Sequence, residues 1–349
     1  MNSHFLDRID IDHMIAGYPT LLLVLIIVVC LVLVSKGADW MVEGVVELAR
    51  RTGLPRLIIG ATIVSLGTTT PEAVVSVMAA FMGSPGLALG NGIGSIIADT
   101  GLIFGLTAML SVVPVDRYLL NRTGWVQAGT ATLLVVIAVV TLIGSVGEPV
   151  LSRWVGLFFL LLLGGYMYTT YFWAKQASIR MPDVHKDERE LLHPAKCWVM
   201  IVGGLFLVVT GARVLIPCAS ECAYRFGVPD DVIAATMVAF GTSLPELITA
   251  IAAILKGYPE IALGNVVGAD VLNCLFVIGA AAAARPLAIH PTFYTFHFPA
   301  MLVILYSFRF FIFINKDNKF KKWQGAWLMG IYFTYIILQF TLNVAGEPG

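Results

Sequence analysis

Two glutamates, Glu72 and Glu246, stand inside long apolar stretches, each at the end of a short polar segment. The first segment reads Gly-Thr-Thr-Thr-Pro-Glu over residues 67–72, and the second reads Gly-Thr-Ser-Leu-Pro-Glu over residues 241–246. A carboxylate within a membrane span costs several kcal/mol and indicates function by default. The pair therefore predicts a site for a cation.

The prolines and hydroxyls beside these glutamates supply further oxygen atoms. A proline inside a helix displaces the carbonyl four residues earlier, so Pro71 frees the carbonyl of Gly67 and Pro245 frees that of Gly241. Such a carbonyl is tolerated in a membrane only when it is buried in protein or lines a cavity. The adjacent hydroxyls belong to Thr68, Thr69, Thr242 and Ser243. Together these are hard oxygen ligands, which suit sodium, calcium or magnesium better than zinc or copper. Taken singly, a kinking proline or a span hydroxyl is more often structural.

A third carboxylate, Asp99, lies 27 residues after Glu72, and the residue 27 after Glu246 is Asn273. No mid-span lysine or arginine is evident nearby, because Arg213 precedes the second segment by almost thirty residues. Unpaired buried carboxylates either bind a cation or take up a proton. Two or three negative charges suit one divalent ion or several monovalent ions, which is the charge basis of an exchange reaction. Asn91 and Asn265 are predicted to brace the neighbouring helices through hydrogen bonds.

The composition places these residues in a membrane. Of the 349 residues, 58% are hydrophobic and 13% are charged, against about 25% charged in soluble domains, and the mean hydropathy is +0.86. The net charge of zero gives no indication of a nucleic-acid partner. The five cysteines form no CxxC pair, and we interpret them as packing residues.

Ten apolar segments are long enough to span a bilayer. They cover residues 18–50, 56–82, 85–112, 124–145, 150–174, 197–224, 229–255, 259–284, 291–314 and 323–343. With ten spans, fifteen lysines and arginines fall on one side and four on the other. Since cytoplasmic loops accumulate basic residues, both termini are predicted to be extracytoplasmic and the hydrophilic loop 175–196 cytoplasmic.

The two polar segments belong to an internal repeat with an offset of 174 residues. Residues 53–105 align with residues 227–279 without a gap, and 19 of the 53 positions are identical. Each half contains five spans, an odd number, so the second copy is inverted relative to the first. The sequence therefore predicts an all-α integral membrane protein of two inverted five-helix repeats, residues 1–174 and 197–349, with broken helices at the midplane. Such repeats are typical of secondary transporters, whose sites lie where the repeats meet.

These residues resemble the cation/calcium exchanger superfamily, whose two repeats carry the sequences GTSxPE and GNxxGSN, here within 60–105 and 234–279. The chain is most similar to the ten-helix prokaryotic sodium/calcium exchangers. The resemblance implies that Glu72 and Glu246 are shared ligands and that Thr68, Thr69, Thr242 and Ser243 contribute oxygens. It also implies sodium ligands at the carbonyls of Ser65 and Ala239 and at the hydroxyl of Ser95.

The chain departs from the family pattern at several positions. Ala269 lacks the hydroxyl found in GSN, and the following residue is Asp270 instead of asparagine. Asn273 occupies the position at which an acid is associated with potassium dependence in the family. The resemblance therefore argues against potassium dependence here. The apolar residues Ile93 and Val267 replace the glutamate of proton-coupled relatives.

We therefore predict an antiporter that exchanges Ca²⁺ for Na⁺ by alternating access, with both ions as substrates, membrane lipid as surroundings and no cofactor. Exchange of another divalent cation such as Mg²⁺ or Mn²⁺, coupling to protons, a passive cation channel, and an intramembrane hydrolase using paired acids are the alternatives. A hydrolase explains the paired acids but not the hydroxyls around them, so no enzymatic activity is expected.

Overall fold

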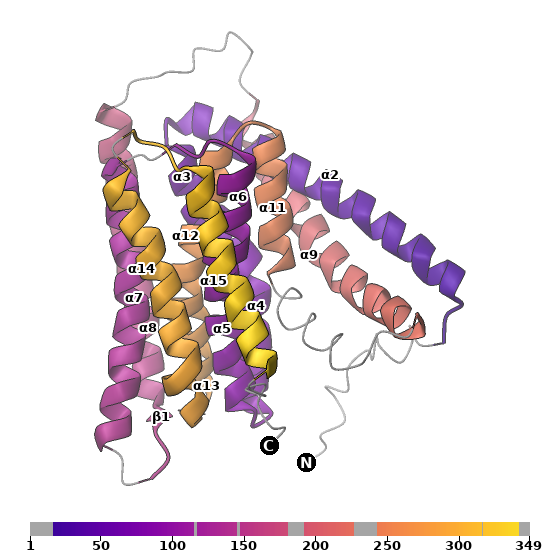
Figure 1. Ribbon diagram of the computed structural model, residues 1–349. Coiled ribbons are helices and arrows are strands. Elements are labelled where there is room, and N and C mark those ends of the chain that lie inside the picture. Colours follow the sequence, from indigo (N-terminus) through magenta and orange to yellow (C-terminus); the bar gives the residue numbers. More distant parts are fainter. Residues whose placement is uncertain are drawn as a thin grey trace.

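The computed structural model describes residues 17–114, 117–144, 147–180, 192–226, 243–315 and 317–341. These segments are almost entirely helical (Figure 1). In the first half the elements are α2 (Thr20–Thr52), α3 (Arg56–Ile59), η2 (Gly60–Val64), α4 (Ser65–Phe81), α5 (Pro85–Ala98), η3 (Asp99–Phe104), α6 (Gly105–Leu110), α7 (Arg117–Gly144), β1 (Val150–Leu151) and α8 (Arg153–Arg180). In the second half they are α9 (Pro194–Arg225), α11 (Leu244–Leu255), α12 (Pro259–Leu272), η4 (Asn273–Ile278), α13 (Gly279–Ala284), β2 (Leu287–Ala288), η5 (Phe293–His297), α14 (Phe298–Ile314) and α15 (Lys322–Thr341).

The predicted spans agree with these helices. Eight helical stretches within the described residues have the length and hydropathy of a membrane span. Helix α15, of 20 residues, occupies the position of the predicted span 323–343 but is not among these eight. The predicted span 229–255 is described only from Ser243, and the described part forms α11.

The internal repeat is visible in the element boundaries. In the first half, α5, η3 and α6 begin at residues 85, 99 and 105. In the second half, α12, η4 and α13 begin at residues 259, 273 and 279, which are the same positions plus 174. The π-helical turns η3 and η4, each of six residues, therefore interrupt equivalent helices at equivalent places. Such turns occur frequently at functional sites.

The helix interruption near Glu72 differs from the prediction. Pro71 lies inside α4, which continues for ten residues beyond it. The irregular backbone lies earlier, in the π-helical turn η2 at Gly60–Val64. In the second half, Pro245 occupies the first turn of α11, where a missing N–H has no helical partner to lose.

Glycines allow α12 to approach the helix that leads into α4. A Cβ atom added at Gly264 would lie 2.1 Å from the carbonyl oxygen of Leu57, and one added at Gly268 would lie 2.4 Å from that of Ala61. From the other side, a Cβ atom at Gly60 would lie 2.7 Å from the carbonyl oxygen of Ile261. The two backbones therefore touch directly, as small residues permit in membrane helices. This contact brings the second repeat against the first.

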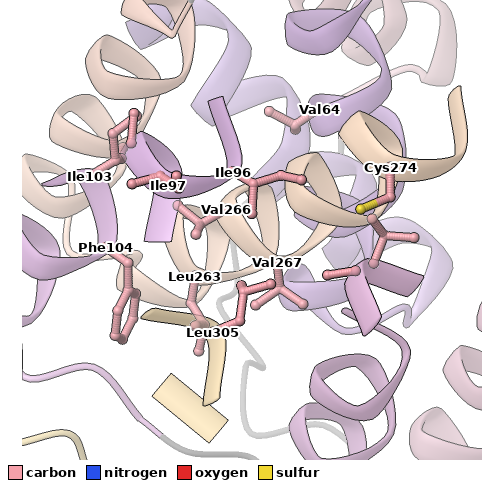
Figure 2. Close-up of a cluster of buried hydrophobic side chains, with 14 of the residues drawn as sticks. Val64, Ile96, Ile97, Ile103, Phe104, Leu263, Val266, Val267, Cys274 and Leu305 are labelled. Carbon is pink, nitrogen blue, oxygen red and sulfur yellow. The ribbon is translucent and has the colours of Figure 1, made fainter. Parts of the chain in front are cut away.

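A buried apolar core surrounds this contact (Figure 2). Figure 2 shows side chains from both repeats meeting there, among them Ile96, Ile97, Val266 and Val267. At one end of the bundle, β1 pairs with β2 in an antiparallel ladder that joins the two halves again.

Helices α2 and α9, one from each repeat, form a pair that leans away from the other helices (Figure 1). Their contact also depends on small residues, because a Cβ atom at Gly204 would lie 2.4 Å from the carbonyl oxygen of Gly37. Many apolar side chains of α2 are exposed, including Leu21, Leu25 and Val32, as expected for a lipid-facing helix.

Lys256, which follows α11, links the core to α2. Its ammonium donates to Glu43 at 2.8 Å and lies 3.4 Å from Asp39. The hydrogen bond to Glu43 raises the pKa of Lys256. A raised lysine pKa means that the contribution to stability is full at neutral pH. It is lost only as the pH rises from the ordinary value of about 10.4 through the raised one.

We expect Lys256→Met to reduce the free energy of unfolding by no more than about 1 kcal/mol, because partly exposed ion pairs are screened by water. Thermal denaturation of the purified protein would measure this. Lys321→Met is the control, since Lys321 lies 3.7 Å from a largely exposed Asp317 and should give no measurable change. A much larger loss of stability for Lys256→Met would contradict the interpretation that its ion pairs with Glu43 and Asp39 are weak.

Candidate cation-binding site

Glu72 lies in the middle of α4 and is buried, with 1% of its surface exposed. The neighbouring helix α5 braces it, because the amide of Asn91 donates to the backbone carbonyl of Glu72 at 3.2 Å and to the hydroxyl of Ser76 at 2.9 Å. The predicted bracing role of Asn91 is confirmed by these contacts. They fix the backbone at the point from which the carboxylate projects.

The two glutamates meet across the repeats. Thr69, one helical turn before Glu72 on α4, donates to Oε1 of Glu246 on α11 at 3.4 Å. Glu246 is 2% exposed and interacts electrostatically with Glu72. The predicted convergence of two acidic side chains from opposite halves is present in the structure.

Asp99 and Asn273 also face each other, at the start of η3 and η4. The amide of Asn273 donates to Oδ2 of Asp99 at 3.4 Å, and both residues are 1% exposed. They occupy equivalent positions of the repeat, so the pseudo-symmetry axis passes between them. Asp99 also accepts a hydrogen bond from Ser243 and interacts electrostatically with Glu72 and Glu246. We call Glu72, Glu246, Asp99 and Asn273 the central cluster.

Some of the remaining predicted site residues lie around the central cluster. The Thr68 hydroxyl is fully buried and has three possible acceptors, the carbonyls of Val64 and Ser65 at 3.3 Å and Oδ1 of Asn265 at 3.4 Å. Thr68 also forms a hydrogen bond with Glu246. Asn265 thus contacts α4, as predicted.

Ser65 is buried at the start of α4, and its hydroxyl donates to the carbonyl of Thr62 at 3.3 Å. Ser95 is buried on α5, one turn before Asp99. Ala239 and Thr242, the other two predicted site residues, lie outside the described residues.

Each member of the central cluster has one buried oxygen without a hydrogen-bond partner among the described residues. These atoms are Glu72 Oε2, Glu246 Oε2, Asp99 Oδ1 and Asn273 Oδ1. A buried charge without a partner is costly unless a proton or a cation neutralises it. Among the described residues, no three Asp, Glu, His or Cys side chains form a metal-binding group by themselves. A cation bound here would therefore also take hydroxyl, amide or carbonyl oxygens.

Two further charged residues, one acidic and one basic, act on the central cluster. Asp270, on α12, is 1% exposed and interacts electrostatically with Asp99. It was noted only as a departure from the family pattern, although its position three residues before Asn273 could have marked it as a fourth buried acid. Arg213 of α9 interacts electrostatically with Glu72. The side chain of Arg213 is exposed, and its influence on Glu72 is weaker than those of burial and of Glu246.

Comparison with known proteins gives the same repeats and the same helices. The chain matches the family described as "Sodium/calcium exchanger protein" in two regions, residues 22–172 and 196–341. It is 31% identical to the sodium/calcium exchanger MaX1 of Methanosarcina acetivorans, over 90% of this chain and 98% of that protein. It is 32% identical to the inner membrane protein YrbG of Escherichia coli, over 93% of this chain and 98% of that protein.

A solved structure of the sodium-calcium exchanger NCX_Mj, soaked with 2.5 mM Na⁺ and 10 mM Sr²⁺, superimposes with a TM-score of 0.75. Its sequence is 27% identical, and the match covers 91% of this chain and 99% of that one. The fold predicted from the sequence, an all-α membrane protein of two inverted five-helix repeats, is confirmed by these matches.

Proposed function

Because the chain belongs to the sodium/calcium exchanger protein family and is a membrane transporter rather than an enzyme, we propose that it exchanges Ca²⁺ for Na⁺ by alternating access. The ions compete for one site formed by Glu72, Glu246, Asp99 and Asn273 with the neighbouring hydroxyls. The transported ions are substrates, and the proposal requires no cofactor.

One observation carries this proposal: the carboxylates of opposite repeats share hydrogen-bonding neighbours inside the protein. Thr69 of the first repeat donates to Glu246 of the second, and Ser243 of the second donates to Asp99 of the first. Oxygens from both repeats therefore surround the same place. In an inverted-repeat transporter such a place can be opened to either side by rocking one group of helices against the other.

The charges explain why exchange is coupled. Two or three carboxylates can be neutralised by one calcium ion or by several sodium ions, but an empty cluster leaves uncompensated charge in a low-dielectric interior. The protein therefore reorients only when the cluster is occupied. Sodium entering down its gradient then drives calcium out.

Helices α2 and α9 are the elements proposed to move. They are long, they lean away from the other helices (Figure 1), and neither carries a residue of the central cluster. Sliding of this pair past the fixed core would expose the cluster to one side and then to the other.

The orientation and the ion dependence complete the proposal. The excess of basic residues supports cytoplasmic placement of the connector 175–196, between repeats 1–174 and 197–349, and extracytoplasmic termini. The neutral amide of Asn273 favours transport that does not require potassium.

The purified protein in sodium-loaded proteoliposomes tests the proposal. We expect radioactive calcium to accumulate when the outside solution lacks sodium, and to do so equally with or without a protonophore. Vesicles loaded with potassium instead of sodium should not accumulate calcium.

Uptake driven equally well by a pH gradient in the absence of sodium would indicate coupling to protons instead of sodium. Uptake without any counter-ion would indicate a channel. Excess Mg²⁺ or Mn²⁺ in the outside solution tests whether either ion competes with calcium for uptake, and so identifies the preferred divalent cation.

A further inference from the structure

Asp270 forms a second polar group next to the central cluster, on the side facing α7. Its Oδ2 accepts hydrogen bonds from the hydroxyl of Thr100, on η3, and from the amide of Gln127, on α7. The same amide also donates to the Thr100 hydroxyl, at 3.2 Å. All three side chains are buried, with at most 2% of their surface exposed. Two elements of the first repeat, η3 and α7, thus orient a carboxylate of the second repeat.

The other oxygen of this carboxylate, Oδ1, is buried and has no hydrogen-bond partner among the described residues. The same is true of Oδ1 of Asn273, one helical turn further along, and of Oδ1 of Asp99, which precedes Thr100 in the chain. Asp99 interacts electrostatically with both Asp270 and Glu246. The acidic cluster therefore continues from the glutamates through Asp99 to Asp270.

The repeat contains only one copy of this arrangement. The residue equivalent to Asp270 in the first repeat is Ile96, and the residue equivalent to Thr100 in the second is Cys274. Neither replacement provides a hard oxygen ligand. The Asp270 group is therefore not part of the symmetric set Glu72, Glu246, Asp99 and Asn273.

We propose that Asp270, with the oxygens of Thr100 and Asn273, binds one additional sodium ion beside the shared site. The ligands are hard oxygens, which suit sodium. The group brings a single carboxylate of its own, so a monovalent ion neutralises it whereas a divalent ion would leave excess positive charge. This inference rests on the proposed sodium–calcium exchange. The added sodium ion does not bind the glutamates, but its charge beside Asn273 and Asp99 opposes calcium binding at the adjoining shared site.

Displacement of bound calcium by sodium in detergent-purified protein tests the inference. Calcium binding is measured by titration calorimetry at increasing Na⁺, with potassium keeping the ionic strength constant. For Asp270→Asn we expect the Hill coefficient of sodium displacement to fall by about one, since it cannot exceed the number of coupled sites. We also expect the half-displacing sodium concentration to rise about tenfold, with little change in calcium affinity when sodium is absent.

Thr100→Val tests the same site without changing charge and should shift the half-displacing concentration in the same direction by a smaller factor. Thr107→Val is the matched control, because Thr107 is also buried and its hydroxyl donates only to the carbonyl of Ile103. It should behave like the wild type. If Asp270→Asn does not fold, the half-displacing sodium concentrations of Thr100→Val and Thr107→Val are compared instead. A shift in Thr100→Val alone supports the site, and no shift in either variant refutes it.

The outcomes separate this inference from the proposed function. If sodium does not displace calcium from the wild type, sodium coupling fails and the additional sodium site fails with it. If sodium displaces calcium from the wild type and from Asp270→Asn with the same Hill coefficient and concentration, the proposed exchange stands and the additional site is refuted. A wild-type sodium response that is lost in Thr107→Val as well would also refute it.

Discussion

Replacing Glu72 or Glu246 by glutamine is expected to reduce sodium-dependent calcium flux below detection while the protein remains folded. Each substitution removes one negative charge and keeps the shape of the side chain. The interaction of two unit charges about 4 Å apart is worth about 4 kcal/mol at an effective dielectric constant of about 20. This corresponds to roughly a thousandfold in affinity. Calcium uptake into sodium-loaded proteoliposomes measures the effect.

Stability distinguishes a lost ligand from a damaged fold. Because each glutamate is buried with an unpartnered oxygen, removing its charge should leave the thermal unfolding temperature unchanged or raise it. Glu148→Gln is the matched control, since Glu148 is exposed in the connection before β1, and it should transport like the wild type. Normal flux in both Glu72→Gln and Glu246→Gln would remove the basis of the proposed site.

The second large effect is expected from Gly264→Ala, which changes no polar group. The added Cβ atom would lie 2.1 Å from the carbonyl oxygen of Leu57 and 3.1 Å from the amide nitrogen of Ala61. Both neighbours are backbone atoms, so α12 and the segment leading into α4 must separate. Overpacking typically costs 1–3 kcal/mol and occasionally more, so a loss of about 3 kcal/mol is expected. Transport should fall as well, because the same contact holds Asn265 against Thr68.

Gly165→Ala provides the comparison for this substitution. Gly165 is an exposed helical glycine of α8, and nothing among the described residues lies within 4 Å of an added Cβ atom. Alanine there should stabilise the helix by up to about 1 kcal/mol. Thermal stability should therefore change in opposite senses for the two alanines, and calcium uptake should fall only for Gly264→Ala. Equal behaviour would show that the close backbone contact at Gly264 is unimportant.

Much of the site could be predicted because it follows from local sequence. Glu72 and Glu246 are recognisable as charges within apolar stretches, since a membrane span tolerates such residues only for a purpose. The 174-residue offset identifies their equivalence without any structural knowledge. It also pairs Asp99 with Asn273, whose side chains indeed meet. Helix boundaries such as those of α5 and α12 follow because Pro85 and Pro259 each occupy a first turn.

Other features depend on how the helices are rotated and docked. Asp270 faces Gln127 of α7 across a separation of more than one hundred residues. This contact has no local sequence signal, because hydropathy shows that a helix spans the membrane but not which neighbouring helix each of its faces contacts. The backbone contact at Gly264 and Gly268 decides this for α12.

The sequence alone thus determined the membrane class, the repeat, the helices and the acids placed within them, since these depend on residue type and spacing along one chain. The tertiary structure decided which oxygens share a neighbour and that a fourth buried acid adjoins the cluster. The reason is physical: small residues let particular backbones touch, and that contact, formed only in the folded protein, sets the direction of every side chain around the site.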